Sequence, residues 1–366
     1  MMKTNFKEGL SIVERVDGES SSLPILKNIL METVNNKIQL TTTNLEAGVS
    51  SLVSGKIIEE GKITVPRAAF SAIINNLPSE RLNLEQKGNN LIIKTDNYEA
   101  TIQGLPAEEF PLIPHIKNQN ESLKINSGVL REAIGQVLAA SQFSEIRPEL
   151  NAMLFDFSLD ALRIVATDSF RLAEKTISKG KFETNIEAPF RILVPIRTAQ
   201  GVLRILGGEG DTTICRDEHQ VLFQSEQWKF VSRLIDATFP DYAAVVPKKF
   251  SSEVVLGRSE FLDALKLAGV FGSKAGEVHC RVLQGKKSIE LYSTEQGLGE
   301  NRHVLSAKIE GGAGEVTFNW RYLSDGLKVL KSEEVYLGLN EDNKPALLKS
   351  PGEGSYFYIL MPVLRA

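Results

Sequence analysis

The chain has 366 residues, of which 42% are hydrophobic and 24% charged, and its formal net charge is −4. This length predicts two or three domains with an ample core, and the acidic balance excludes a protein that is basic over its whole surface. Cys215 and Cys280 lie far apart and have no neighbour at metal-ligand spacing, so we expect neither a disulfide framework nor a zinc site. Residues 1–10 lack an apolar signal segment, and no apolar run reaches spanning length. We expect a soluble, cytoplasmic protein with no membrane partner.

One pattern of elements occurs three times along the chain. Each copy begins with apolar residues at helical spacing, in residues 6–16, 130–138 and 262–269, and Ser127 is the expected N-cap of the second of these helices. Paired strands with tight turns follow, at 35–36, 159–160 and 285–286. A second set of turns falls at 43–44, 167–168 and 294–295. The same order of elements in each copy predicts three related units.

A short strand running into a second helix completes the pattern. Pro66, Pro195 and Asn319 stand at equivalent places near the first turn of that helix, where proline is tolerated. The spacing between them is that of a whole domain, far longer than a solenoid repeat. We predict an α+β fold of three homologous domains, 1–120, 121–249 and 250–366, each with two helices packed on an antiparallel sheet.

Enzyme signatures are weak in this sequence. It has no GxxxxGK[ST] phosphate loop, and the glycine pairs at 207–208 and 311–312 lack dinucleotide-binding spacing. His115, His219, His279 and His303 are scattered, with no metal spacing and no serine elbow. We therefore expect no catalytic residues, no metal and no cofactor.

Cations on the predicted helices are more informative. A soluble helix face of mixed charge is one interpretation. If the helices of three homologous domains line one side, the same cations form a continuous surface that binds duplex DNA through its phosphates without reading sequence. The expected DNA-facing residues are Arg15, Arg67, Arg131, Arg197, Arg204, Lys266, Arg321 and Lys328.

The segment ATDSFRLA, residues 166–173, follows an alternating strand pattern and contains turn residues. Taken alone, it predicts either a hairpin with a surface salt bridge or a docking rim. The equivalent segments NLEAGVS and EQGLGEN lack its Phe-Arg-Leu set. This difference between copies favours a binding site in the middle domain.

The sequence resembles the bacterial β sliding clamps, the processivity subunits (beta subunits) of DNA polymerase III. The motifs that carry the resemblance span the chain: LPILKNIL (23–30), TVP (64–66), GLPAEEFP (104–111), LNAMLF (150–155), ATDSFRLA (166–173), LVP (193–195), FPDY (239–242) and MPV (361–363). The resemblance implies a DNA-clamp fold in a ring-forming, head-to-tail homodimer that encircles double-stranded DNA. The implied partners are the polymerase catalytic subunit, the clamp loader and other proteins with a clamp-binding motif.

The resemblance also implies two kinds of contact site. Partner peptides are expected in an apolar pocket between the second and third domains. Its residues are Leu150, Thr167, Ser169, Phe170, Arg171, Leu172, Pro240, Val245, Pro345, Ile359, Met361, Pro362 and Val363. The expected dimer interface pairs the first-domain edge with a third-domain element and includes Tyr98, Ala100, Ile102, Val270, Phe271, Glu295 and Glu300.

Four departures from the family pattern qualify these expectations. Ser169 and Phe170 replace a common Gly-His pair, and Ala244 replaces a common arginine, which predicts a changed partner preference. Serine precedes LPIL in place of an arginine, and Glu149 stands where tyrosine is common, which predicts weaker DNA contacts. Two other classes of function stay open: an enzyme on a repeated fold, and a scaffold that binds peptides but not DNA.

Overall fold

A computed structural model describes residues 1–16, 23–113, 115–116, 119–144, 146–273, 275–283, 285, 287–341 and 343–363. The chain forms two compact units. The first contains Met1–Arg131, Lys181–Glu187 and Arg197–Leu234, and the second contains Glu132–Gly180, Ala188–Ile196 and Ile235–Ala366. The helices are α1 (Lys3–Val13), α2 (Arg67–Asn76), α3 (Ser127–Leu138), α4 (Ile196–Ile205), α5 (Arg258–Val270) and α6 (Trp320–Val329).

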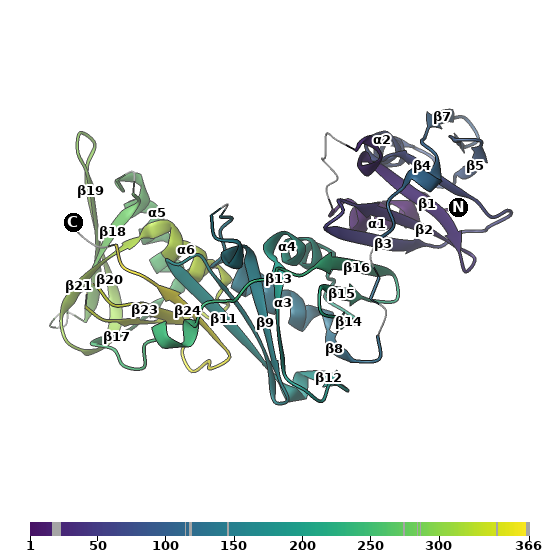
Figure 1. Ribbon diagram of the computed structural model, residues 1–366. Coiled ribbons are helices and arrows are strands. Elements are labelled where there is room, and N and C mark those ends of the chain that lie inside the picture. Colours follow the sequence, from purple (N-terminus) through teal and green to yellow (C-terminus); the bar gives the residue numbers. More distant parts are fainter. Residues whose placement is uncertain are drawn as a thin grey trace. The chain divides into compact units, whose positions relative to one another are not determined.

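In the first unit, a nine-stranded sheet has the order β12-β8-β14-β15-β16-β3-β2-β1-β4, and a separate sheet has the order β5-β6-β7 (Figure 1). Helices α1 and α2 pack on each other, where Phe6 and Phe70 meet edge to face at 5.8 Å. The strands are β1 (Asn28–Val34), β2 (Lys37–Thr43), β3 (Ala47–Val53), β4 (Lys62–Pro66), β5 (Asn83–Lys87), β6 (Asn90–Lys94), β7 (Glu99–Gln103), β8 (Ser122–Asn126), β12 (Phe182–Thr184), β14 (Asp211–Arg216), β15 (Gln220–Gln224) and β16 (Trp228–Arg233).

In the second unit, one twelve-stranded sheet has the order β13-β9-β10-β11-β24-β23-β22-β17-β20-β19-β18-β21. Helices α5 and α6 pack together, and α6 also contacts β24 and β21 (Figure 1). The strands are β9 (Ala152–Ser158), β10 (Ala161–Thr167), β11 (Arg171–Ser178), β13 (Phe190–Pro195), β17 (Ser252–Gly257), β18 (Glu277–Leu283), β19 (Ser288–Glu295), β20 (Gly299–Gly311), β21 (Gly314–Asn319), β22 (Glu334–Leu339), β23 (Ala346–Lys349) and β24 (Tyr356–Leu360).

Each large sheet continues across a predicted domain boundary. Strand β3 pairs with β16 from Ser51↔Trp228 to Ala47↔Ser232, and β11 pairs with β24 from Arg171↔Leu360 to Lys175↔Tyr356. Both pairings are antiparallel and leave no free strand edge at the junction. Sheet hydrogen bonds therefore join the repeats to each other.

The expected repeat of two helices per copy is confirmed, with differences at the helix ends. Ser127 lies inside α3, and the predicted N-cap is wrong: Asn126 Oδ1 accepts the N–H groups of Gly128 and Val129 at 3.0 and 3.3 Å. Arg15 lies beyond the last residue of α1. Among the described residues, no helix is long and apolar enough to cross a membrane, and no group of three metal-ligating side chains comes together.

Candidate functional site

The segment ATDSFRLA forms a tight turn between β10 and β11. Asp168 Oδ1 accepts the backbone N–H groups of Phe170 and Arg171, both at 2.9 Å, and Thr167 Oγ1 donates to Arg171 O at 2.7 Å. Ser169 has a φ of +78°, in the left-handed region that disfavours residues other than glycine by about 1 kcal/mol. The local hydrogen bonds hold the turn in this conformation.

Arg171 turns inward from this turn and is only 8% exposed. Its Nε donates to Asp168 Oδ2 and its Nη1 to Asp325 Oδ2, both at 2.8 Å, and its Cζ lies 4.3 Å from the centroid of the Tyr322 ring. Burial alone lowers the pKa of Arg171, but the neighbouring Tyr358, Asp325 and Asp168 together raise it above its usual value. The guanidinium is therefore charged and bound within its own chain.

Phe170 turns outward and is 59% exposed. Its ring stacks on Tyr322, with the centroids 6.5 Å apart, and its carbonyl accepts the N–H of Met361 at 2.8 Å. Leu172 and Ile359 face each other across the β11–β24 pairing and belong to a buried apolar cluster. The structure thus brings predicted pocket residues from the turn and from the C-terminal segment together around an exposed aromatic ring.

Other predicted pocket residues surround this centre less closely. Leu150 is buried in a short 3-10 helix, Pro148–Asn151, and Val245 is 47% exposed in another, Tyr242–Val245. Pro345 precedes β23, where its carbonyl accepts a hydrogen bond from Asn340 Nδ2 at 3.3 Å. Pro362 is buried, and the N–H of Val363 donates to Thr317 O on β21 at 2.8 Å. The described end of the chain is thus fixed at two places, the turn between β10 and β11 through Met361 and strand β21 through Val363.

Sequence reasoning missed three residues at this site. Arg147 Nη1 donates to Ser169 Oγ at 2.9 Å, and its Nε donates to Glu149 at the same distance. Tyr322 and Asp325 come from α6, the second helix of the third copy. The repeats contain one signal for Asp325. When the copies are aligned at Asn319 and Pro195, this acidic residue stands where the middle copy has Gly201.

A groove of about 830 Å³ lies over β9, β10, β11 and β13, and the connecting segment that contains Pro240 forms its other wall. Leu154 and Leu193 supply apolar surface, while Asp156 and Arg191 form an ion pair at 3.0 Å. Burial, followed by a hydrogen bond with Glu174, raises the pKa of Tyr242. The groove shares Pro240 with the predicted pocket and has a rim of mixed charge. Ala244, one of the departures from the family pattern, is exposed in the same segment.

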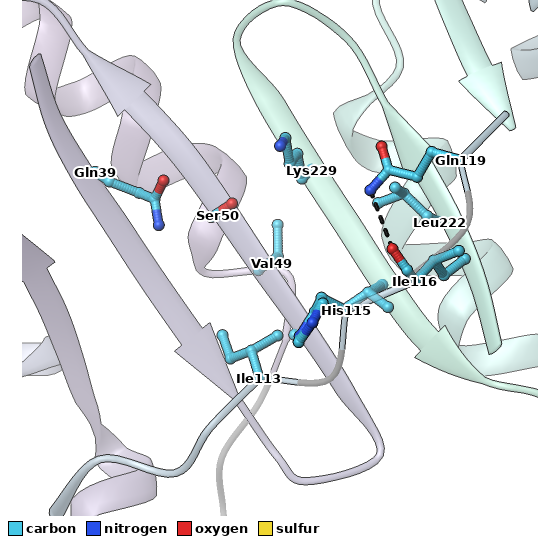
Figure 2. Close-up of a pocket in the computed structure, with 11 residues that line it drawn as sticks. Gln39, Val49, Ser50, Ile113, His115, Ile116, Gln119, Leu222 and Lys229 are labelled. Atoms are coloured by element: carbon cyan, nitrogen blue, oxygen red, sulfur yellow. Dashed lines mark hydrogen bonds between the residues drawn. The ribbon is translucent and has the colours of Figure 1, made fainter. Parts of the chain in front are cut away.

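A smaller cavity of about 230 Å³ lies in the first unit, over the junction of β3 with β16 (Figure 2). Its apolar lining includes Val49 and Leu222, and its polar lining includes Gln39 from β2 and Lys229 from β16, which Figure 2 shows on the two sheet segments. Gln119 Nε2 donates to Ile116 O at 3.3 Å, which fixes part of the connecting segment beside the cavity.

The predicted DNA-facing residues lie on or next to the helices, and most of them are exposed. Arg67 is the half-buried exception: its Nη1 donates to Val16 O at 3.0 Å. Two of the cations have acidic neighbours one turn away, because Lys266 pairs with Asp263 at 2.8 Å and Lys328 with Asp325 at 3.2 Å. The exposed ones are Arg15, Arg131, Arg197, Arg204, Lys266, Arg321 and Lys328. The serines that precede LPIL lie outside the described residues.

The predicted interface residues lie in two regions: strand β7 with the residue before it, and the end of α5 with strands β19 and β20. Strand β7 is an edge of its three-stranded sheet; it contains Ala100 and Ile102, and Tyr98 directly precedes it. Val270, which is 60% exposed, ends α5, and the next residue is Phe271. A Cβ atom added to Gly299, the first residue of β20, would lie 3.7 Å from the Phe271 ring. Glu295 ends β19, and Glu300 in β20 accepts a hydrogen bond from Tyr292 at 3.3 Å.

Comparison with known proteins adds independent information. Three family models match the chain: the N-terminal, central and C-terminal domains of the DNA polymerase III beta subunit, over residues 1–114, 124–241 and 243–364. Curated proteins named beta sliding clamp include one from Synechocystis, 27% identical over 99% of this chain and 97% of its own length, and one from Bacillus subtilis, 26% identical over 99% and 98%.

Solved structures agree with the sequence relatives. The DNA polymerase III beta subunit of Thermotoga maritima has a TM-score of 0.92 with 26% identity, covering 100% of this chain and 99% of that one. A Pseudomonas aeruginosa sliding clamp bound to griselimycin has a TM-score of 0.93 with 25% identity, covering 100% and 98%. The chain belongs to the DNA polymerase III beta subunit family and has its three-domain clamp fold, as the repeats and the resemblance together predicted.

Proposed function

We propose that this protein is a sliding clamp, a non-catalytic processivity factor in DNA replication. Two copies associate head to tail in a ring around double-stranded DNA and tether the replicative polymerase in the cytoplasm. The proposed domains are 1–120, 121–249 and 250–366. The observation that carries the proposal is the threefold repeat of a two-helix unit, matched domain by domain to one family. Processivity then follows from topology, because a closed ring cannot leave the DNA sideways.

Contact with DNA is proposed for the helices. Their exposed arginines and lysines can neutralise phosphates without reading bases, and such contacts weaken steeply with salt. The Asp263–Lys266 and Asp325–Lys328 pairs offset part of this positive charge. Loose contacts of this kind suit a ring that must slide.

Ring closure is proposed between the edge strand β7 of one copy and, in the third domain of the other copy, the end of α5 with strands β19 and β20. An edge strand offers unpaired backbone groups to a second chain. The exposed side chain of Val270, with Phe271 beside it, supplies apolar surface, and Glu295 and Glu300 supply charge for ion pairs. A head-to-tail dimer uses this contact twice.

Partner docking is proposed at the peptide-docking site, by which we mean Thr167–Leu172 with Ile359 and Met361. The exposed ring of Phe170 above the buried Leu172 and Ile359 offers an apolar anchor, and the turn around it is held rigid by hydrogen bonds. The proposed partners are the polymerase catalytic subunit, the clamp loader and other proteins with a clamp-binding motif.

Retention on DNA tests this function. After incubation with a clamp loader and ATP, the protein should stay on a closed circular plasmid through gel filtration and be lost when the plasmid is linearised. Light scattering should give the mass of a dimer. A stable monomer, or equal retention on circular and linear DNA, would contradict the ring, and peptide binding without DNA retention would favour a scaffold. Saturable turnover that is lost when one polar residue is changed would indicate an enzyme.

A further inference from the structure

Asp325 on α6 contacts two cations with its two carboxylate oxygens. Oδ2 accepts from Arg171 Nη1 at 2.8 Å, and Oδ1 accepts from Lys328 Nζ at 3.2 Å. The Arg171 side chain is 9% exposed, that of Asp325 37% and that of Lys328 61%. One carboxylate therefore lies between a buried cation of the peptide-docking site and an exposed cation of the proposed DNA-facing surface.

On the buried side, the contact reaches the docking turn itself. Arg171 also donates to Asp168, whose other oxygen holds the backbone of Phe170 and Arg171. The Tyr322 ring, one turn before Asp325 on α6, lies against both the Arg171 guanidinium and the Phe170 ring. The position of Arg171 thus sets the position of the exposed aromatic anchor.

The other inter-repeat junction forms without an equivalent of the Arg171–Asp325 ion pair. In the first unit, the turn that ends in Ala47 matches the turn that ends in Arg171, and Gly201 stands at the position equivalent to Asp325. A Cβ atom on Gly201 would meet the Phe230 ring at 2.9 Å, so no side chain has room there. The β3–β16 pairing joins the two repeats there, with Ala47 in place of Arg171 and Gly201 in place of Asp325.

We propose that Asp325 is a positioning residue that couples duplex DNA on α6 to peptide docking; the inference rests on the proposed function. Without DNA, Asp325 divides its charge between Lys328 and Arg171. When a phosphate of the DNA backbone forms an ion pair with Lys328, the Asp325 carboxylate interacts with Arg171 alone. It then holds the docking turn more firmly. DNA therefore tightens peptide binding, and by linkage the peptide tightens DNA binding by the same factor.

The experiment measures the affinity of a fluorescein-labelled peptide, copied from the clamp-binding segment of the organism's own replicative polymerase, by anisotropy. The full-length dimer is titrated with and without a saturating short DNA duplex, whose own binding is measured separately. Wild type should bind the peptide roughly fivefold more tightly with duplex. D325N should bind more weakly and show no duplex effect, and K328Q should bind tightly without duplex.

The matched control is D263N. Asp263 pairs with Lys266 on α5 at the same i,i+3 spacing, and this ion pair does not involve Arg171. D263N should keep both the wild-type peptide affinity and the duplex effect. A duplex effect that survives in D325N overturns the inference, as does a D325N protein that melts earlier but binds peptide like wild type. Wild type that binds peptide without any duplex effect also overturns it and leaves the proposed function standing. Wild type that binds no peptide at all contradicts the function itself.

Discussion

Two turns at equivalent places in the repeats share a backbone and differ in what they display. In the first unit, Thr43 Oγ1 donates to Ala47 O at 2.8 Å, and Asn44 Oδ1 accepts the N–H groups of Glu46 and Ala47. Leu45 has a φ of +76°. The turn Thr167–Arg171 repeats each of these features, with Asp168 for Asn44 and Ser169 for Leu45.

Both turns also accept a hydrogen bond from the next repeat. Glu46 O accepts from Arg233 N at 2.9 Å, and Phe170 O accepts from Met361 N at 2.8 Å. The backbone and the junction are therefore general to the fold. What distinguishes the second turn is a pair of side chains, Phe170 and Arg171, and the residues of α6 that hold them.

The largest expected effect concerns the C-terminal segment. Deleting residues 362–366, of which 364–366 lie outside the described residues, removes the Val363–Thr317 hydrogen bond and the buried Pro362 next to Met361. Binding of polymerase-derived peptides, measured by anisotropy, should fall at least roughly a hundredfold, or about 2.7 kcal/mol. The dimer should persist in light scattering, since the proposed interface lies elsewhere. Unchanged peptide affinity would mean that the docking site is misplaced.

Arg171→Ala removes the cation that the equivalent first turn lacks. It leaves the buried carboxylate of Asp168 without its ion-pair partner, and breaking such a pair costs about 3 kcal/mol of unfolding free energy. Denaturant unfolding should show this loss.

Arg147→Ala is the control for that measurement. The Arg147 side chain is 48% exposed, so its loss should cost less than about 1 kcal/mol. Equal effects of the two substitutions would mean that the inward position of Arg171 contributes nothing to stability.

Glycine and alanine substitutions compare the two turns directly. Because Ser169 and Leu45 both have positive φ, glycine should exceed alanine in stability by about 1 kcal/mol at each position. Both S169G and S169A lose the hydrogen bond from Arg147, so this loss cancels in the difference between their unfolding free energies. The difference between L45G and L45A gives the reference value. Denaturant unfolding of the four variants checks this, and a greater stability of alanine at either site would show that the backbone there is not left-handed.

The sequence alone predicted much of the fold, because helical and strand periodicity repeat in each copy and the turn residues stand at matching places. It did not predict that the sheets run through the junctions, since the β3–β16 and β11–β24 pairings join segments far apart in the chain. Nor did it predict that Arg171 turns inward, because its partner Asp325 lies 154 residues away. The predicted docking, DNA-facing and interface residues remain predictions.

The most direct test of the docking site is the peptide affinity of Phe170→Glu, which gives the docking turn the residue found at the same place in the first turn. Phe170 is 59% exposed, so the variant should fold like wild type. Ile58→Glu, at a residue that is 92% exposed in the first unit, is the control for added charge. We expect at least roughly tenfold weaker binding of a polymerase-derived peptide to F170E, about 1.4 kcal/mol, and no change for I58E. Equal affinities of the two folded variants would contradict a docking site at this turn.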